Sequence, residues 1–197
     1  MHPAHQAYAL TRWLVAFSLL LSGCLHPITR ANELLPSEQT QIYANQLLHL
    51  KLQLYGDYEL NLRPRNQMDA LTKPYVKHLG LRRSQRTLLF TGRTFVTPTF
   101  LLRALWIRQS PDWAAKGFRQ TTNGRYLRST TVGTDLRLEY AVALTSQQGW
   151  LYLLAVAPAP TASEMEKDLL PSSLTQRQEV MEGEFERFIF PSVEPTL

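Results

Sequence analysis

The chain has a single cysteine, Cys24, among its 197 residues. No disulfide can form within the chain, and a zinc site built on several cysteines is excluded. The nine glycines are scattered and form none of the glycine-rich loops that hold phosphates in nucleotide-binding proteins. The apolar run from Trp13 to Leu21 is well short of the about 20 residues needed to span a bilayer. A permanent transmembrane helix at this run is therefore not expected.

Common catalytic and metal-binding motifs are absent from the sequence. His26, His49 and His78 are not spaced as metal ligands, and we interpret each as a surface or edge residue. The sequence contains no His-Glu-x-x-His motif and no Gly-x-Ser-x-Gly motif. No cofactor is predicted. An active site assembled from residues distant in sequence stays open, because single-sequence patterns do not detect one.

The first 23 residues have the layout of an export signal. A short, weakly basic start is followed by the apolar run from Trp13 to Leu21 and then by the small residues Ser22 and Gly23. No Ala-x-Ala type cleavage site stands just after the run, as an ordinary cleaved signal usually has. The alternative interpretations are an ordinary cleaved signal or a chance cysteine.

The run Leu21-Ser22-Gly23-Cys24 resembles the lipobox of bacterial lipoproteins. This resemblance implies that the chain is cut between Gly23 and Cys24 and that Cys24 receives fatty acyl chains. Two or more acyl chains give stable membrane anchoring. In Gram-negative members of this family, a residue other than aspartate after the cysteine, here Leu25, implies transfer to the outer membrane rather than retention at the inner membrane.

Charge is distributed unevenly along the chain. Residues 51–137 contain sixteen lysines and arginines against five acidic residues, whereas residues 138–197 contain three against nine. Either the two parts neutralise each other, or the basic part meets an anionic partner. For an exported protein we expect a lipid head group, a lipopolysaccharide phosphate or an acidic protein surface, and no nucleic acid.

The densest basic cluster is Arg82-Arg83-Ser84-Gln85-Arg86. Guanidinium groups at Arg82, Arg83 and Arg86 would suit phosphates or carboxylates of a partner. The alternative, which we favour, is a solvated loop in front of a strand.

Alternating apolar residues predict several strands before residue 110. Leu50 to Leu54 and Tyr58 to Leu62 are predicted to form a hairpin, which Pro64 ends. Arg86 to Phe95 and Phe100 to Gln109 are predicted to form a second pair. The later strand is apolar on both faces apart from Arg103, which indicates that both faces are covered. A brief helix is expected from Ser37 towards Leu48, and a helix over 67–79 is left open because Pro74 would interrupt it.

The range 124–157 predicts a three-stranded meander. Gly133-Thr134 has the chemistry of a two-residue hairpin turn. Counting outward from it pairs Arg128 with Glu139, an opposite-charge pair across the two strands. The same register pairs Thr131 with Leu136, Ser129 with Leu138, and Leu127 with Tyr140. Trp150 to Ala157 forms the third strand.

The apolar positions between Leu174 and Ile189 follow helical spacing, which predicts a C-terminal amphipathic helix laid across the sheet. The expected fold class is therefore α+β with an antiparallel sheet. The expected organisation is a signal peptide over 1–23, a lipidated tether over 24–41 and one globular domain over 42–197.

The run Gly149-Trp150-Leu151-Tyr152 and the helix ending Phe185-Glu186-Arg187-Phe188 resemble the layout of the PsbP-like family. This likeness covers about a third of the chain and implies an accessory or assembly role. No functional residue can be carried over from it.

Three functions remain open at this point. The first is a lipid-anchored binding or accessory subunit of an envelope assembly, without catalytic activity. The second is a periplasmic hydrolase acting on cell-wall or lipid substrate, and the third is a carrier of a small apolar ligand.

Overall fold

The computed structural model describes residues 27–36, 40–55, 58–64, 72–94, 101–121, 124–133, 135–144, 149–157 and Glu179. The signal segment, Cys24 and the expected cleavage site lie outside these residues. So does the expected C-terminal helix, of which Glu179 alone is described, as helical and exposed.

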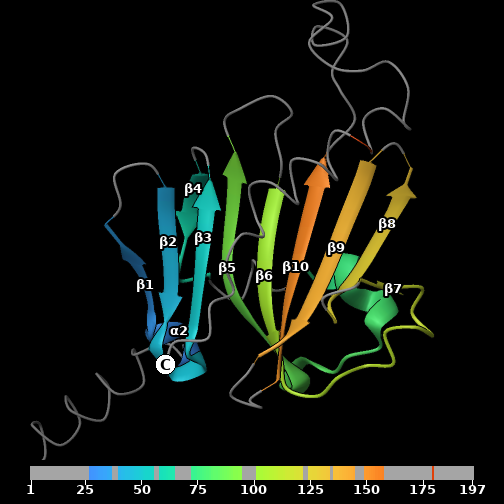
Figure 1. Cartoon of the computed structure of the whole chain (residues 1–197), viewed down its shortest axis with the longest axis horizontal. Helices are drawn as coiled ribbons and strands as arrows, with labels where there is room; N and C mark the ends of the chain where they lie inside the picture. Colours follow the sequence, from blue (N-terminus) through green and yellow to red (C-terminus); the bar gives the residue numbers. More distant parts are fainter. Residues whose placement is uncertain are drawn as a thin grey trace, which may run out of the picture.

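Two antiparallel sheets make up the described fold (Figure 1). The smaller sheet has the order β1-β2-β3, formed by Asn32–Leu35, Thr40–Asn45 and Leu50–Tyr55. The larger sheet has the order β4-β5-β6-β10-β9-β8-β7. Its strands are Tyr58–Asn61, Arg86–Thr94, Leu101–Ile107, Trp150–Ala157, Asp135–Ala143, Tyr126–Val132 and Arg119–Gln120.

Short helical segments connect the strands. They are α2 (Pro27–Arg30), the 3-10 turns η1 (Gln46–Leu48), η2 (Lys77–Leu79) and η3 (Arg83–Gln85), and a helical stretch over residues 72–76. The described part of the chain is therefore mostly antiparallel sheet with little helix, which agrees with the antiparallel sheet predicted from the sequence.

One face of the large sheet packs against the small sheet. Their shared core contains Tyr43 and Leu52 of the small sheet together with Phe90 and Leu153 of the large one, all fully buried. The rings of Tyr43 and Phe90 lie 4.6 Å apart between centroids. Burying side chains of this size contributes about 1.5–3 kcal/mol each, so this interface holds the two sheets together.

A buried hydrogen-bond network also joins the two sheets. The Asn32 amide donates to the carbonyl oxygens of Leu62 and Leu89, beside and within the large sheet. Its side-chain oxygen accepts hydrogen bonds from the Tyr43 hydroxyl and the Asn45 amide, each at 2.7 Å. Every polar group of the Asn32 side chain is therefore satisfied, as burial requires.

The predicted meander is confirmed, and so is the predicted register of its first two strands. Arg128 pairs with Glu139, and the other three predicted pairs also hold. Gly133 has a φ of 63°, a conformation that glycine adopts without steric cost. Trp150–Ala157 joins this hairpin as the third strand and then pairs with β6 on its other side.

The strand pair at 86–109 is also confirmed. β5 and β6 are antiparallel, with a register shift between Leu88 and Phe90. Alternate residues of β6 belong to two separate cores, Leu102, Ala104 and Trp106 on one face and Leu105 and Ile107 on the other. The prediction of a strand covered on both faces was therefore correct.

The predicted hairpin at 50–62 was wrong in its pairing. Both strands exist, but β3 pairs with β2 in the small sheet, whereas β4 pairs with β5 in the large sheet. Alternation identifies a strand and its buried face, but it does not identify the neighbouring strand. The chain passes from one sheet to the other between Tyr55 and Tyr58.

The region before residue 49 also differs from expectation. The helix expected from Ser37 towards Leu48 is replaced by β2 and η1, because pairing with both β1 and β3 satisfies this backbone as a central strand. Much of the expected tether is folded, since α2 and β1 lie within 27–35 and Asn32 is buried.

Candidate functional site

The face of the large sheet that points away from the small sheet has an apolar end and a polar end. We call it the arginine face, because Arg103, Arg128 and Arg137 all lie on it. At the apolar end, Leu105 and Tyr152 are buried under Trp113 and Phe118. The rings of Trp113 and Tyr152 are stacked, with centroids 6.3 Å apart.

At the polar end, the strand register aligns one residue from each of six strands, five of them polar. Directly opposite residues share a face in an antiparallel sheet. The successive pairs define a polar row, interrupted by one leucine: Asn61 (β4), Thr91 (β5), Arg103 (β6), Leu154 (β10), Glu139 (β9) and Arg128 (β8).

Glu139 has no exposed surface, although it carries a carboxylate. The Tyr152 hydroxyl donates a hydrogen bond to its Oε1 at 2.7 Å. His78 Nε2 lies 3.0 Å from Oε1, and Arg128 Nη1 lies 3.3 Å from Oε2. A buried carboxylate is tolerated when it is paired and hydrogen-bonded in this way.

The pKa of Tyr152 reflects these surroundings. Burial raises this pKa well above its ordinary value, and the nearby carboxylate of Glu139 raises it further. The hydroxyl therefore keeps its proton and remains a hydrogen-bond donor to Glu139. The cluster therefore joins β8, β9 and β10 to the segment that contains His78.

Two further arginines contact a single aromatic ring. The guanidinium carbons of Arg103 and Arg137 lie 4.6 Å and 4.8 Å from the centroid of the Tyr75 ring, within cation–π range. One strand, β10, separates the strands of the two arginines, so β6 and β9 lie about 9.6 Å apart across the sheet. The ring of Tyr75 contacts both guanidinium groups across that gap.

Arg103 is the most unusual member of the polar row. Only 8% of the residue is exposed, and its Nη1 atom makes no hydrogen bond. In the part of the chain that the structure describes, no carboxylate lies at ion-pair distance from it. Burial lowers the pKa of Arg103, and Tyr75 partly opposes this shift. A positive charge is thus held in the sheet with little compensation.

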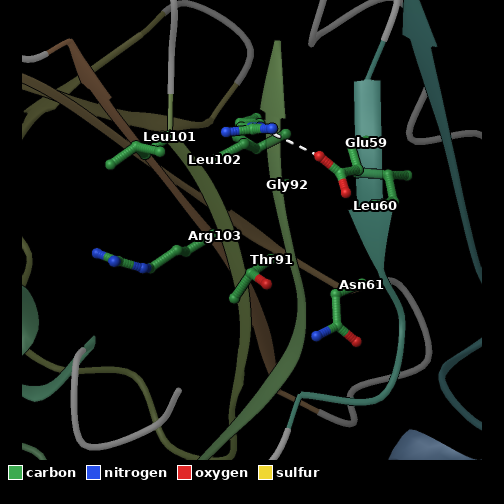
Figure 2. A pocket seen from close by; sticks show the side chains of 9 residues that line it. Glu59, Leu60, Asn61, Thr91, Gly92, Leu101, Leu102 and Arg103 are labelled. Atoms are coloured by element: carbon green, nitrogen blue, oxygen red, sulfur yellow. Dashed lines mark hydrogen bonds and ion pairs between the residues drawn. The ribbon is translucent and has the colours of Figure 1, made fainter. Parts of the chain in front are cut away.

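A cavity of about 280 Å³ lies beside Arg103, over strands β4, β5 and β6. Figure 2 shows the side chains that line it, with Arg103 extending from β6 on the side opposite Glu59. Glu59 forms an ion pair with Arg93 at 3.1 Å, and more than half of each side chain is exposed. The polar members of the lining are Glu59, Asn61, Thr91, Arg93 and Arg103.

The buried carboxylate and the cavity are separate features of this face. A general acid or base has to reach its substrate, and the fully buried Glu139 does not line the cavity. Among the described residues there is no cluster of three potential metal ligands of the His, Cys, Asp or Glu type. The carboxylate that does line the cavity, Glu59, is ion-paired with Arg93.

The structure separates the three arginines that the sequence placed in one cluster. Arg82 and Arg83 are exposed around η3, but Arg86 is 7% exposed at the start of β5. Two hydrogen bonds close this loop: the Arg82 backbone nitrogen donates to the Gln85 side-chain oxygen at 2.8 Å, and the Gln85 nitrogen donates to the Arg82 carbonyl oxygen at 3.0 Å. Strand alternation turns Arg86 inward, so the three guanidinium groups do not form one contact surface.

Sequence reasoning missed Tyr75 and His78 as parts of the arginine face. His49 lies exposed in the turn before β3, as expected, whereas His78 contacts the buried Glu139. The segment around Pro74 gave no clear periodicity, so nothing in it indicated which face it would cover. Arg103 offered a signal, because it is the one charged residue in an otherwise apolar strand.

Within the described residues, no helix has both the length and the apolar character required to cross a membrane. Comparison with protein-family models, curated proteins and solved structures found no match.

Proposed function

We propose that this protein is a lipid-anchored subunit of a cell-envelope assembly, held at the periplasmic face of the outer membrane, and that it binds a partner or ligand without catalysing a reaction. The anchoring part of this proposal is supported by Leu21-Ser22-Gly23-Cys24 after an apolar run of signal-peptide length. The binding part is carried by one observation, the buried Arg103 beside a cavity, with Tyr75 but no carboxylate of the described residues at its guanidinium.

Two alternatives receive less support. A hydrolase needs a reactive group within reach of substrate, and the most densely contacted carboxylate, Glu139, is fully buried. A carrier of an apolar ligand needs an enclosed apolar cavity, whereas the cavity over β4, β5 and β6 contains three charged residues beside its three leucines. We therefore favour a binding role.

Two finer predictions about the fold belong to the same proposal. The amphipathic sequence from Leu174 to Ile189 would form a helix against the sheet, with its glutamates directed to solvent. The likeness of 124–190 to the PsbP-like layout agrees with an accessory role. Both are tested by a structure of the lipidated protein.

Metabolic labelling tests the anchor directly. The full-length gene is expressed in its own host with a clickable palmitate analogue, beside a Cys24→Ser variant, and membranes are separated on a density gradient. We expect label on the wild-type protein, in the outer-membrane fraction, and no label on Cys24→Ser. An unlabelled wild-type protein in the soluble fraction would refute the anchor.

A further inference from the structure

The first described helix, α2, lies at one end of the strands (Figure 1). It begins at Pro27, three positions after Cys24. η1 follows β2 at the same end, and the Asn45 amide donates to the Ile28 carbonyl oxygen at 2.8 Å, which ties η1 to α2. The described segment nearest in sequence to Cys24 and the turn after β2 therefore form one surface.

η3 and the end of β6 belong to the same surface. α2 contacts β5, and η3 directly precedes β5. The backbone nitrogen of Arg108, the residue after β6, donates to the Gln85 carbonyl oxygen of η3 at 2.9 Å. We call α2, η1, η3 and Arg108 together the anchor end of the molecule.

The anchor end is strongly positive. It presents four exposed arginines, which are Arg30, Arg82, Arg83 and Arg108. The described carboxylates nearest to them in sequence are Glu33, which accepts a hydrogen bond from a glutamine side chain, and Asp112, which accepts one from a backbone nitrogen. Glu59 in β4 and Asp135 in β9 lie at the opposite end of the strands. A partner of this surface therefore has to be anionic.

Leu47 adds an exposed apolar group to the anchor end. It lies in η1 and is 51% exposed, more than any other large apolar side chain of the described residues. A surface that rests on a membrane combines apolar side chains at the head-group boundary with cations that meet anionic lipids. A single exposed leucine is ordinary by itself, so its position among the four arginines carries the argument.

We propose that the anchor end lies on the membrane and binds the head groups of anionic phospholipids, with Leu47 inserted between them and the exposed arginines facing their phosphates. The inference deepens the anchoring part of the proposed function and rests on it. Acyl chains at Cys24 would hold this end at the bilayer, where each arginine close to an anionic surface strengthens the contact about fivefold. The contact fixes the orientation of the molecule, with the opposite end of the strands away from the membrane.

A thiol-reactive fluorophore tests this orientation. Acylation occupies the sulfur of Cys24, the single cysteine of the chain, so an introduced cysteine is the one free thiol. Leu47→Cys places the fluorophore at the anchor end. Val132→Cys is the matched control, because Val132 is 47% exposed at the end of β8, on the opposite side of the molecule from η1. Each full-length variant is purified lipidated from its host and reconstituted into phosphatidylcholine vesicles that contain or lack phosphatidylglycerol and carry a spin-labelled lipid as quencher.

In vesicles with phosphatidylglycerol, we expect the fluorophore at position 47 to be quenched several-fold more strongly than the one at position 132. Arg82→Gln combined with Arg108→Gln should shift the balance from the contacting to the free orientation by roughly 25-fold, since two arginines are lost. Lys73→Gln combined with Lys77→Gln removes the same charge from exposed residues of the segment that contacts the arginine face. This control pair should leave the quenching unchanged.

The proposal is overturned if positions 47 and 132 are quenched equally, if phosphatidylglycerol makes no difference, or if the lysine pair matters as much as the arginine pair. The last result would show attraction by net charge alone. The wild-type protein tests the anchor separately, because an acylated Cys24 offers no thiol to the fluorophore. A wild-type protein that takes up the fluorophore refutes the anchor and this inference together. An unlabelled one that stays with the vesicles, while the variants lack the expected quenching, keeps its anchor and overturns this inference alone.

Discussion

Replacing Tyr152 with phenylalanine removes one oxygen from the most buried charged site in the described structure. The hydroxyl donates at 2.7 Å to Glu139 Oε1, and neither residue is exposed. A hydrogen bond to a charged group contributes about 1.5–3 kcal/mol, and the loss leaves a carboxylate oxygen without its donor. We expect Tyr152→Phe to lower the free energy of unfolding by about 2–3 kcal/mol, measured by urea denaturation at neutral pH.

Tyr126→Phe is the matched control. Tyr126 is partly buried on the same face, and its ring stacks on Trp113 with centroids 6.0 Å apart. Phenylalanine keeps that packing, so we expect a change within about 0.5 kcal/mol. The comparison separates the effect of the buried hydroxyl from the general effect of removing a phenol.

A double-mutant cycle with Glu139→Gln then measures the coupling. Glutamine keeps the shape of the side chain but removes the charge that strengthens the hydrogen bond, so Tyr152→Phe should cost less in this background by about 1 kcal/mol. If Tyr152→Phe costs no more than Tyr126→Phe, or costs the same with and without Glu139, the buried charged cluster is not what stabilises this face.

Three further predictions concern the rest of the fold. Asn32→Ala removes four hydrogen bonds of a buried network, and should lower the free energy of unfolding by about 2–4 kcal/mol in urea titrations. An unchanged midpoint would mean that the two sheets do not depend on this network. Gly149→Ala would place a methyl group 2.3 Å from the Ile107 carbonyl oxygen at a φ of 116°, and should cost more in thermal stability than Gly124→Ala, where nothing lies within 4 Å. Equal losses of thermal stability in the two variants would contradict the close approach of Gly149 to the Ile107 carbonyl oxygen. Burial raises the pKa of Tyr140 to about 12, so the folded chain holds a proton that the unfolded chain releases near pH 10. The contribution of this hydroxyl to the free energy of unfolding is therefore fully present below pH 10 and is lost as pH rises from 10 towards 12. Tyr140→Phe should make the fall in urea midpoints across this range less steep.

The sequence was most informative where local chemistry determines geometry. Gly133-Thr134 sets the meander turn, and a two-residue turn sets the register of every pair outward from it, which is why the pairing of Arg128 with Glu139 could be predicted. The two-faced apolar pattern of β6 likewise reflects burial on both sides. In both cases the deciding information lies within a few residues of chain.

The sequence was least informative where distant segments meet. β3 and β4 follow one another closely, yet they pair in different sheets, and alternation is the same for either arrangement. The contacts of Tyr75 with Arg103 and Arg137 join parts of the chain 28 and 62 positions apart. The cavity beside Arg103 is likewise formed by three strands, so no single stretch of sequence contains it.

The early start of folded structure limits how far an anchored molecule can extend. Helix α2 begins at Pro27, three positions after Cys24, and three extended residues cover at most about 10 Å. If acyl chains hold Cys24 in a membrane, the small sheet has to sit almost against the head groups. The three-residue linker is then too short to let the folded part move far from the bilayer. Its partners therefore have to come to the lipid surface, or belong to it.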